Sequence, residues 1–241
     1  MTRPHLRLLS AASNEEEHPL IDDIVTGPSA QQVAAAIARG IVPDERLFDR
    51  FLTYEHRIVS CLHWTPLAVA LRAGEWLNQH DVKTVVDIGS GAGKFCVVAA
   101  LATECNFIGV EQRSRLIGAA RNLAEVFGVE HRVQFKHGTL SDGVVPKADA
   151  YYLYNPFGEN LFGSEDRLDE EVELGKERYQ RDIALTEALL QQAPVGTYLI
   201  KYNGFGGLVP TSYDVVHTDF CLPNLLRMWQ KARPSESAGA G

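Results

Sequence analysis

The pattern of hydrophobic and polar positions changes near residue 82 and divides the chain into two parts. Upstream, apolar residues recur at the three- and four-residue spacing of amphipathic helices. Downstream, short apolar runs alternate with helical segments, which is the pattern of βαβ units and a mostly parallel sheet. The sequence therefore predicts an α/β domain over residues 81–233, preceded by a helical extension over residues 28–80.

Three helices are predicted in the extension from their start signals. A capping box begins at Ser29, directly ahead of an apolar run. Asp44 is expected to cap a second helix that continues to Ile58. Thr65 as N-cap, with Pro66 at the first helical position, predicts the third.

Seven short apolar runs predict strands, and three segments between them have the spacing of helices. The last two runs have no long crossover between them, so we expect an antiparallel pair at the sheet edge. The linker between the third and fourth strands is too short for a full helix. The predicted strands cover residues 84–88, 106–111, 132–136, 149–154, 197–202, 213–220 and 225–232, and the helices cover 94–103, 114–127 and 168–192.

Composition narrows the class of protein. A length of 241 residues and a net charge of −8 favour one catalytic domain and exclude a surface that is basic throughout. Residues 1–27 and 234–241 are polar and aperiodic, which predicts a disordered acidic arm and a disordered tail. The cysteines and histidines show no metal-binding spacing, so no metal is expected. No apolar run reaches the roughly 18 residues of a membrane span, and we expect a cytoplasmic protein.

A glycine-rich turn follows the first predicted strand. That strand ends at Asp87, and Gly89, Gly91 and Gly93 precede the next helix. Glycines are needed where a backbone turns sharply and approaches a ligand without a Cβ in the way. The dinucleotide pattern G-x-G-x-x-G requires glycine at position 94, where lysine stands, and the P-loop pattern requires Ser or Thr after that lysine, where phenylalanine stands. The turn therefore predicts a nucleotide site of another kind, D-x-G-x-G-x-G.

Glu111 ends the next strand, 22 residues after Gly89, where a carboxylate can accept hydrogen bonds from both hydroxyls of a ribose. The glycine motif together with Glu111 resembles the class I S-adenosylmethionine-dependent methyltransferases over residues 82–232. The resemblance implies a Rossmann-like fold with a seven-stranded, mostly parallel sheet, an antiparallel last strand, and S-adenosylmethionine as cofactor. It implies methionine near Gly89–Gly93, ribose at Glu111 and adenine after the third strand, with Asp142 as the candidate for its amino group.

The residues after the fourth strand should face the reactive methyl group, because ligands bind outside the carboxyl ends of parallel strands. Asn155, Pro156 and Phe157 resemble the Asn-Pro-Pro-aromatic motif of amino-group methyltransferases, one residue shorter. They are also similar to the Asn-x-Phe pattern of Dot1-like lysine methyltransferases. The Thr65-Pro66 helix start upstream of the glycine motif is similar to the same group of enzymes. We expect oxygens of Asn155 and Pro156 to orient a nitrogen, while Phe157 contacts a planar base or an ammonium.

Residues 159–182 follow this motif and hold nine acidic residues against four basic ones, a net charge of −5. One hypothesis is that they recognise a basic substrate and repel nucleic acid. A solvated helix face explains the same charges. The predicted function is S-adenosylmethionine-dependent methyl transfer to a nitrogen on a basic protein or an amine. The alternatives are methylation of adenine in RNA or DNA, a non-catalytic S-adenosylmethionine-binding module and, more distantly, a nicotinamide oxidoreductase.

Overall fold

The structure is a computed structural model that describes residues 27–220 and 224–233. The predicted arm and tail lie outside the described residues, apart from Gly27. The strands are β1 (Thr84–Ile88), β2 (Asn106–Glu111), β3 (Val133–His137), β4 (Ala150–Tyr154), β5 (Tyr198–Tyr202), β6 (Tyr213–Asp219) and β7 (Leu226–Lys231).

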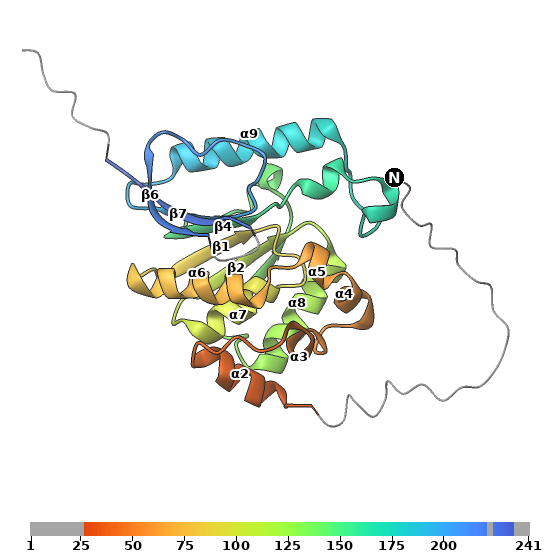
Figure 1. Cartoon of the computed structure of the whole chain (residues 1–241). Helices are drawn as coiled ribbons and strands as arrows, with labels where there is room; N and C mark the ends of the chain where they lie inside the picture. The colour runs from red at the N-terminus through yellow and green to blue at the C-terminus, as the bar shows by residue number, and fades with distance from the viewer. Residues whose placement is uncertain (1–26, 221–223, 234–241) are drawn as a thin grey trace, which may run out of the picture.

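All seven strands form one sheet, in the order β3-β2-β1-β4-β5-β7-β6 (Figure 1). Strands β1 to β5 pair in parallel, whereas β7 runs antiparallel to both β5 and β6. The predicted fold class is therefore confirmed, including the reversed last strand. Because β7 lies between β5 and β6, β6 forms the edge.

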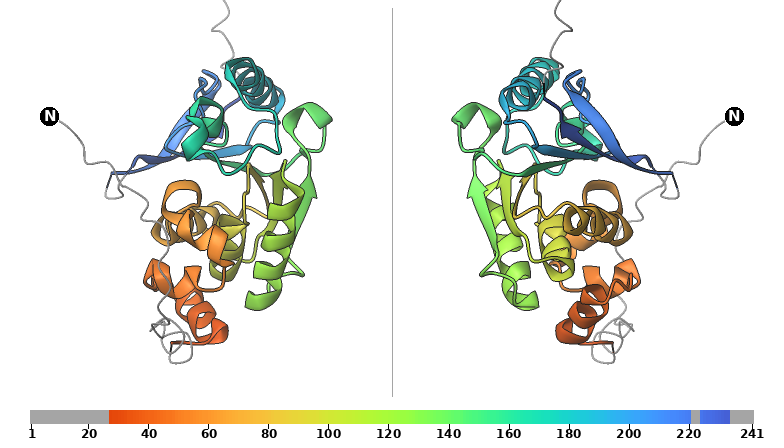
Figure 2. Two further views of the ribbon diagram at one scale, coloured as in Figure 1. Left: turned by 90° about the vertical axis from the view of Figure 1, so that its right-hand side faces the viewer. Right: turned by 90° about the vertical axis from the view of Figure 1, so that its left-hand side faces the viewer.

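Helices cover both faces of the sheet. They are α2 (Ala30–Ala38), α3 (Glu45–Asp49), α4 (Tyr54–Ile58), α5 (Ser60–His63), α6 (Leu67–Gln79), α7 (Lys94–Ala102), α8 (Ser114–Phe127) and α9 (Lys176–Gln192), with 3₁₀ turns η1 (Leu140–Asp142), η2 (Gly158–Leu161) and η3 (Ser164–Asp166). Helices α6 to α8 lie on one side of the sheet and α9 on the other (Figures 1 and 2). The two-residue alternation of the strands separates the two cores, since Val85 and Tyr152 face α6 to α8, while Val86 and Tyr151 face α9.

The N-terminal extension shares the core of the α/β domain. Phe48 of α3 stacks on Phe127 of α8 with the ring centroids 4.7 Å apart. Val33 and Ile37 of α2 are buried in the same cluster as α7 and α8. Both views in Figure 2 place these helices on the side of the sheet opposite α9.

Three predicted helices have the wrong boundaries. In each case a distant contact or a change of backbone conformation sets the observed start or end. Helix α6 begins at Leu67, whose N–H donates to Glu45 Oε1 at 2.6 Å, while the Thr65 hydroxyl bonds Tyr152. The helix predicted from Asp44 to Ile58 is split into α3 and α4. The helix predicted from residue 168 begins at Lys176, after Gly175 with a φ of 145°.

Candidate functional site

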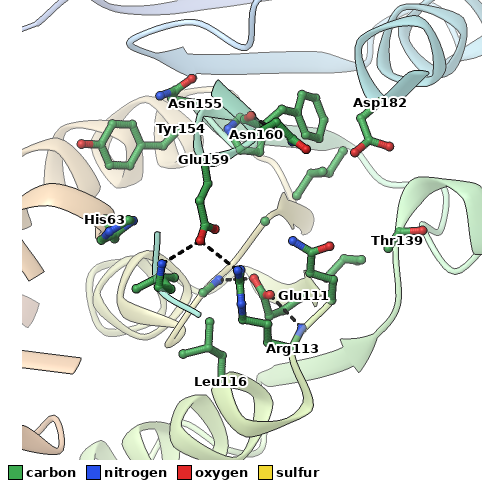
Figure 3. A pocket seen from close by; sticks show the side chains of 18 of the residues that line it. His63, Glu111, Arg113, Leu116, Thr139, Tyr154, Asn155, Glu159, Asn160 and Asp182 are labelled. Carbon is green, nitrogen blue, oxygen red and sulfur yellow. Dashed lines mark hydrogen bonds and ion pairs between the residues drawn. The ribbon is translucent and has the colours of Figure 1, made fainter. Parts of the chain in front are cut away.

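A cavity of about 420 Å³ crosses the carboxyl ends of the parallel strands (Figure 3). Its size falls within the range of small-molecule sites. Its walls come from the loops after β1 to β5, from α5, and from α9 and the segment before it. The lining residues include Cys61, Leu62, His63, Trp64, Gly89, Gly91, Glu111, Gln112, Arg113, Thr139, Leu140, Tyr154, Asn155, Pro156, Phe157, Glu159, Phe162, Arg178, Asp182 and Asn203.

Four N–H groups of the glycine loop already have acceptors within the protein. Gly89 and Ser90 donate to the Val110 carbonyl at 2.9 and 3.0 Å, Gly93 donates to the Ser90 carbonyl, and Gly91 donates to the Glu111 carboxylate at 3.0 Å. A phosphate site needs such N–H groups free to bind the anion. This bonding disfavours the nicotinamide alternative and favours a ligand without phosphate.

Glu111 lies in the centre of the cavity wall (Figure 3). Its two oxygens accept N–H bonds from Gly91 and Arg113, at 3.0 and 2.9 Å. Burial raises the pKa of Glu111, and these N–H donors oppose the shift. A carboxylate has about four acceptor positions, so two remain for a diol in the cavity. The Glu111 carboxylate therefore lies where the predicted ribose contact requires an acceptor.

The predicted cofactor residues divide into two groups. Gly89, Gly91 and Glu111 line the cavity, whereas Gly93 packs against Phe135 and Ala120. Asp87 faces a smaller neighbouring cavity, accepts a 3.4 Å hydrogen bond from the Cys96 thiol, and has its pKa raised to about 7 by burial.

Asp142 is exposed and caps η1. Its Oδ2 accepts from the N–H and the hydroxyl of Thr139, at 2.8 and 2.9 Å. Thr139 and Leu140 of the same turn line the cavity, but Asp142 does not. Its contact with adenine stays a prediction.

Asn155, Pro156 and Phe157 all line the cavity at the end of β4. Asn155 has a left-handed φ of 41°, and its N–H donates to the carbonyl of Gly204 beyond β5 at 2.9 Å. Pro156 contacts the glycine loop so closely that a Cβ on Gly89 would lie 2.8 Å from the proline Cβ. The predicted acceptor motif and the glycine motif therefore meet at one cavity.

One wall of the cavity comes from the N-terminal extension, through residues that the sequence did not single out. Cys61, Leu62, His63 and Trp64 line the cavity. The Trp64 indole N–H donates to the His56 carbonyl at 2.9 Å, and its ring covers Gly91, where a Cβ would lie 2.3 Å from the ring. Asn203, directly after β5, also lines the cavity and has a φ of 56°.

Lys94 connects the extension to the glycine loop. It is buried in the first turn of α7, and its ammonium lies 2.6 Å from both Glu45 and Asp49 and 3.1 Å from the Ser60 hydroxyl. These partners lie on α3 and α5. Lys94 therefore binds the helices that complete the cavity and does not line the cavity itself.

Arginines that follow β2 bind the acidic segment 159–182. Arg113 is 3% exposed and donates to Glu159 at 2.9 Å (Figure 3). It also donates to both oxygens of Asp169 at 2.9 Å. The carboxylates of Asp169 and Glu159 raise the pKa of Arg113 against the opposing effect of burial. Arg178 pairs with Asp182 within the segment itself and also donates to Gln112 Oε1 at 3.0 Å. These three carboxylates are therefore neutralised and do not form a free acidic wall.

Within the part of the chain that the structure describes, no helix has the length and apolar character needed to cross a membrane. Among the same residues, no group of three or more His, Cys, Asp or Glu side chains is placed to hold a metal ion.

Comparison with known proteins agrees with this geometry. Residues 79–150 match the family model of a methyltransferase domain. The RNA methyltransferase of Salinibacter ruber, solved in complex with S-adenosyl-L-homocysteine, is 22% identical, with 73% of this chain and 99% of that chain covered and a TM-score of 0.50. The O-methyltransferase of Bacillus cereus, solved with the same ligand, is 13% identical, with coverages of 86% and 100% and a TM-score of 0.55.

A putative O-methyltransferase of Klebsiella pneumoniae is 14% identical, with 85% of this chain and 97% of that chain covered and a TM-score of 0.53. No curated protein matches the chain in sequence. At these identities the likeness to solved structures establishes the fold. The chain has the class I methyltransferase fold, and its residues 79–150 match a methyltransferase domain.

Proposed function

We propose that this protein transfers the methyl group of S-adenosylmethionine to a nitrogen acceptor. One observation carries the proposal: Glu111 and the Asn155-Pro156-Phe157 motif line the same cavity, with Gly89 and Gly91 between them in the wall. The carboxylate suits the ribose of the cofactor, and the asparagine suits a nitrogen that carries hydrogens.

S-adenosylmethionine supplies an activated methyl group, so the protein needs chiefly to align a nitrogen lone pair with it. The amide oxygen of Asn155 and the carbonyl of Pro156 can accept hydrogen bonds from the nitrogen and thereby direct its lone pair. Phe157 is 6% exposed and gives this end of the cavity an apolar surface that excludes water.

A nitrogen on a protein or an amine is the first candidate for the acceptor. Glu165, Glu170 and Glu177 are exposed and form no ion pair among the described residues. These charges would repel a phosphate backbone. The paired carboxylates of Glu159, Asp169 and Asp182 give no support to this candidate.

A nucleobase nitrogen is the second candidate, on a different observation. The aromatic rings of Tyr154, Phe157 and Phe162 line the cavity together with the amide of Asn155. Tyr154 and Phe157 stand on either side of Asn155 in the sequence. Aromatic rings and an amide suit a flat, neutral ring with an amino group. The two candidates make different predictions in the same assay.

Cofactor binding is the first test. S-adenosylhomocysteine should bind the wild-type protein in calorimetry, and Glu111→Gln should weaken it at least tenfold, because the amide presents a donor where a ribose hydroxyl needs an acceptor. Glu125→Gln, an exposed glutamate on α8, is the matched control and should bind like the wild type. Binding of NAD without S-adenosylhomocysteine would refute the proposal.

Methyl transfer from labelled S-adenosylmethionine is the second test. Label should enter protein or small amines in a cell extract if the first candidate is right, and purified RNA or DNA if the second is right. Binding without any labelling would support the non-catalytic module. Label on oxygen instead of nitrogen would contradict the proposed acceptor.

A further inference from the structure

Asp182 places an unpaired carboxylate oxygen in the cavity wall. The residue is 3% exposed, and its side chain is directed into the cavity from α9 (Figure 3). Oδ2 accepts from Arg178 Nε at 2.5 Å, but Oδ1 is buried and has no hydrogen-bond partner. A buried acceptor without a donor costs about 1 to 3 kcal/mol, so native proteins seldom retain one without a reason. The oxygen is therefore placed to receive a donor from a ligand.

Two contacts place Asp182 at the β2 and β3 end of the cavity. Helix α9 packs on η1, the turn after β3. Arg178, which holds Asp182, also donates to Gln112 Oε1 at 3.0 Å, directly after Glu111. In Figure 3, Asp182 and Thr139 lie on one side of Glu111, whereas His63, Tyr154 and Asn155 lie on the other.

The direction of a bound nucleoside follows from these positions, and here the inference rests on the proposed function. With the ribose at Glu111 and the transferred methyl near Asn155, the base must extend toward the opposite end, where Thr139, Leu140 and Asp182 lie. The adenine base carries an exocyclic amino group, which donates hydrogen bonds. A carboxylate oxygen is the matching acceptor.

We infer that Oδ1 of Asp182 accepts a hydrogen bond from the 6-amino group of the cofactor's adenine, and that Arg178 holds the carboxylate in place. Asp142 is less suited to this contact, since it is exposed and one of its oxygens already accepts two hydrogen bonds from Thr139. Asp182 thus selects for adenine over a base with a carbonyl at the same position.

Calorimetry with S-adenosylhomocysteine and S-inosylhomocysteine tests the inference. The two ligands differ at C6, where the amino group of adenine is replaced by a carbonyl. Wild-type protein should prefer the adenosyl ligand by about tenfold or more. In Asp182→Asn, Arg178 retains the amide oxygen and turns the amide N–H₂ toward the cavity. The preference should then vanish or reverse, because the inosyl carbonyl gains a donor.

Asp214→Asn, at an exposed aspartate on β6 away from the cavity, is the matched control and should keep the wild-type preference, whereas Asp142→Asn tests the competing assignment. An unchanged preference in Asp182→Asn, or its loss in Asp142→Asn, would overturn the inference while leaving cofactor binding intact. If wild-type protein binds neither ligand, the proposed function fails as well. Should Asp182→Asn not fold, Asp182→Glu replaces it. The longer side chain of Asp182→Glu displaces the carboxylate, so the preference for the adenosyl ligand should fall severalfold. An unchanged preference would again overturn the inference.

Discussion

At the scale of single residues, the acceptor end of the cavity depends on asparagines in an uncommon backbone conformation. Asn155 and Asn203 follow the neighbouring strands β4 and β5, and both have a positive φ. Asparagine tolerates the left-handed region better than most residues with a side chain. At position 155 this conformation lets the backbone turn toward Gly204 while the residue still lines the cavity.

Asn155→Gly separates the backbone role of this residue from its chemical role. Glycine adopts the same φ without strain, so the fold and the affinity for S-adenosylhomocysteine should stay within a few-fold of wild type. The turnover number should fall about a hundredfold, because the acceptor nitrogen loses the group that orients it. Labelled-methyl kinetics and calorimetry on the same preparation measure the two effects.

Asp81→Gly is the control for that experiment. Asp81 is another non-glycine residue with positive φ, at 54°, and it is exposed at the opposite end of β1 from the cavity. Turnover should be unchanged. An equal loss of turnover in both variants would mean that backbone flexibility, and not the amide of Asn155, is responsible.

At the scale of elements, the N-terminal extension acts as a wall of the cavity because one buried cation connects it to the glycine loop. Lys94 on α7 binds Glu45 and Asp49 on α3, and Glu45 also caps α6 at Leu67. The same extension presents Trp64 to the cavity. Loss of this connection should therefore affect stability and cofactor binding together.

Lys94→Met should lower the free energy of unfolding by about 3 to 5 kcal/mol, because it leaves two carboxylates without their buried partner. Urea denaturation measures this, and calorimetry should show weaker binding of S-adenosylhomocysteine. Lys83→Met is the control, since Lys83 pairs with Asp81 on the exposed surface and its loss should change stability little. Equal stability of the two variants would show that the Lys94 cluster is not a structural connection.

The sequence predicted elements well wherever their signals are local. The strands from β1 to β7 match the predicted runs within one residue at each end, because each is a short apolar run bounded by polar or glycine positions. The start of α6 was missed because its cap, Glu45, is 22 residues away. The candidate site shows the same limit. Asn155 belongs to a local motif that the sequence reveals, whereas Asp182 stands in a polar helix, and only the fold brings its carboxylate to the cavity wall beside Arg178.

At the scale of the whole molecule, a pair of histidines joins the sheet edge to the helical layer. His80, after α6, and His217 of β6 approach with their Nε2 atoms 2.7 Å apart, which requires one ring to be the acceptor. Tyr198 contacts His80, and Trp76 stacks on His217 with the ring centroids 5.1 Å apart. Burial lowers the pKa of His217, and the charges of His80 and Arg72 lower it further.

Stability should therefore fall on mild acidification. Because the pKa of His217 is lower in the folded state than its ordinary value of 6.5, the unfolded chain takes up the proton first. The free energy of unfolding should decrease as the pH falls below about 6.5 and level off below the folded pKa. Urea denaturation between pH 5 and pH 8 measures the slope.

His217→Gln should reduce this slope. Part of the slope should remain, because burial also lowers the pKa of His56. The exposed His131→Gln is the control and should keep the wild-type slope. A slope that is the same in all three proteins would rule out the histidine pair as its source.

The three tryptophans of this chain occupy three separate environments, and this distribution makes the protein its own fluorescent reporter. Trp64 covers Gly91 and lines the cavity, so a ligand there changes the surroundings of its indole. Trp76 stacks on His217, so we expect protonation of that imidazole to change its emission. Trp229 is buried in the other core, with Leu190 of α9, and Lys201 and Arg227 lie near its ring. Single-tryptophan variants would therefore separate the optical signal of ligand binding from that of proton uptake without any attached dye.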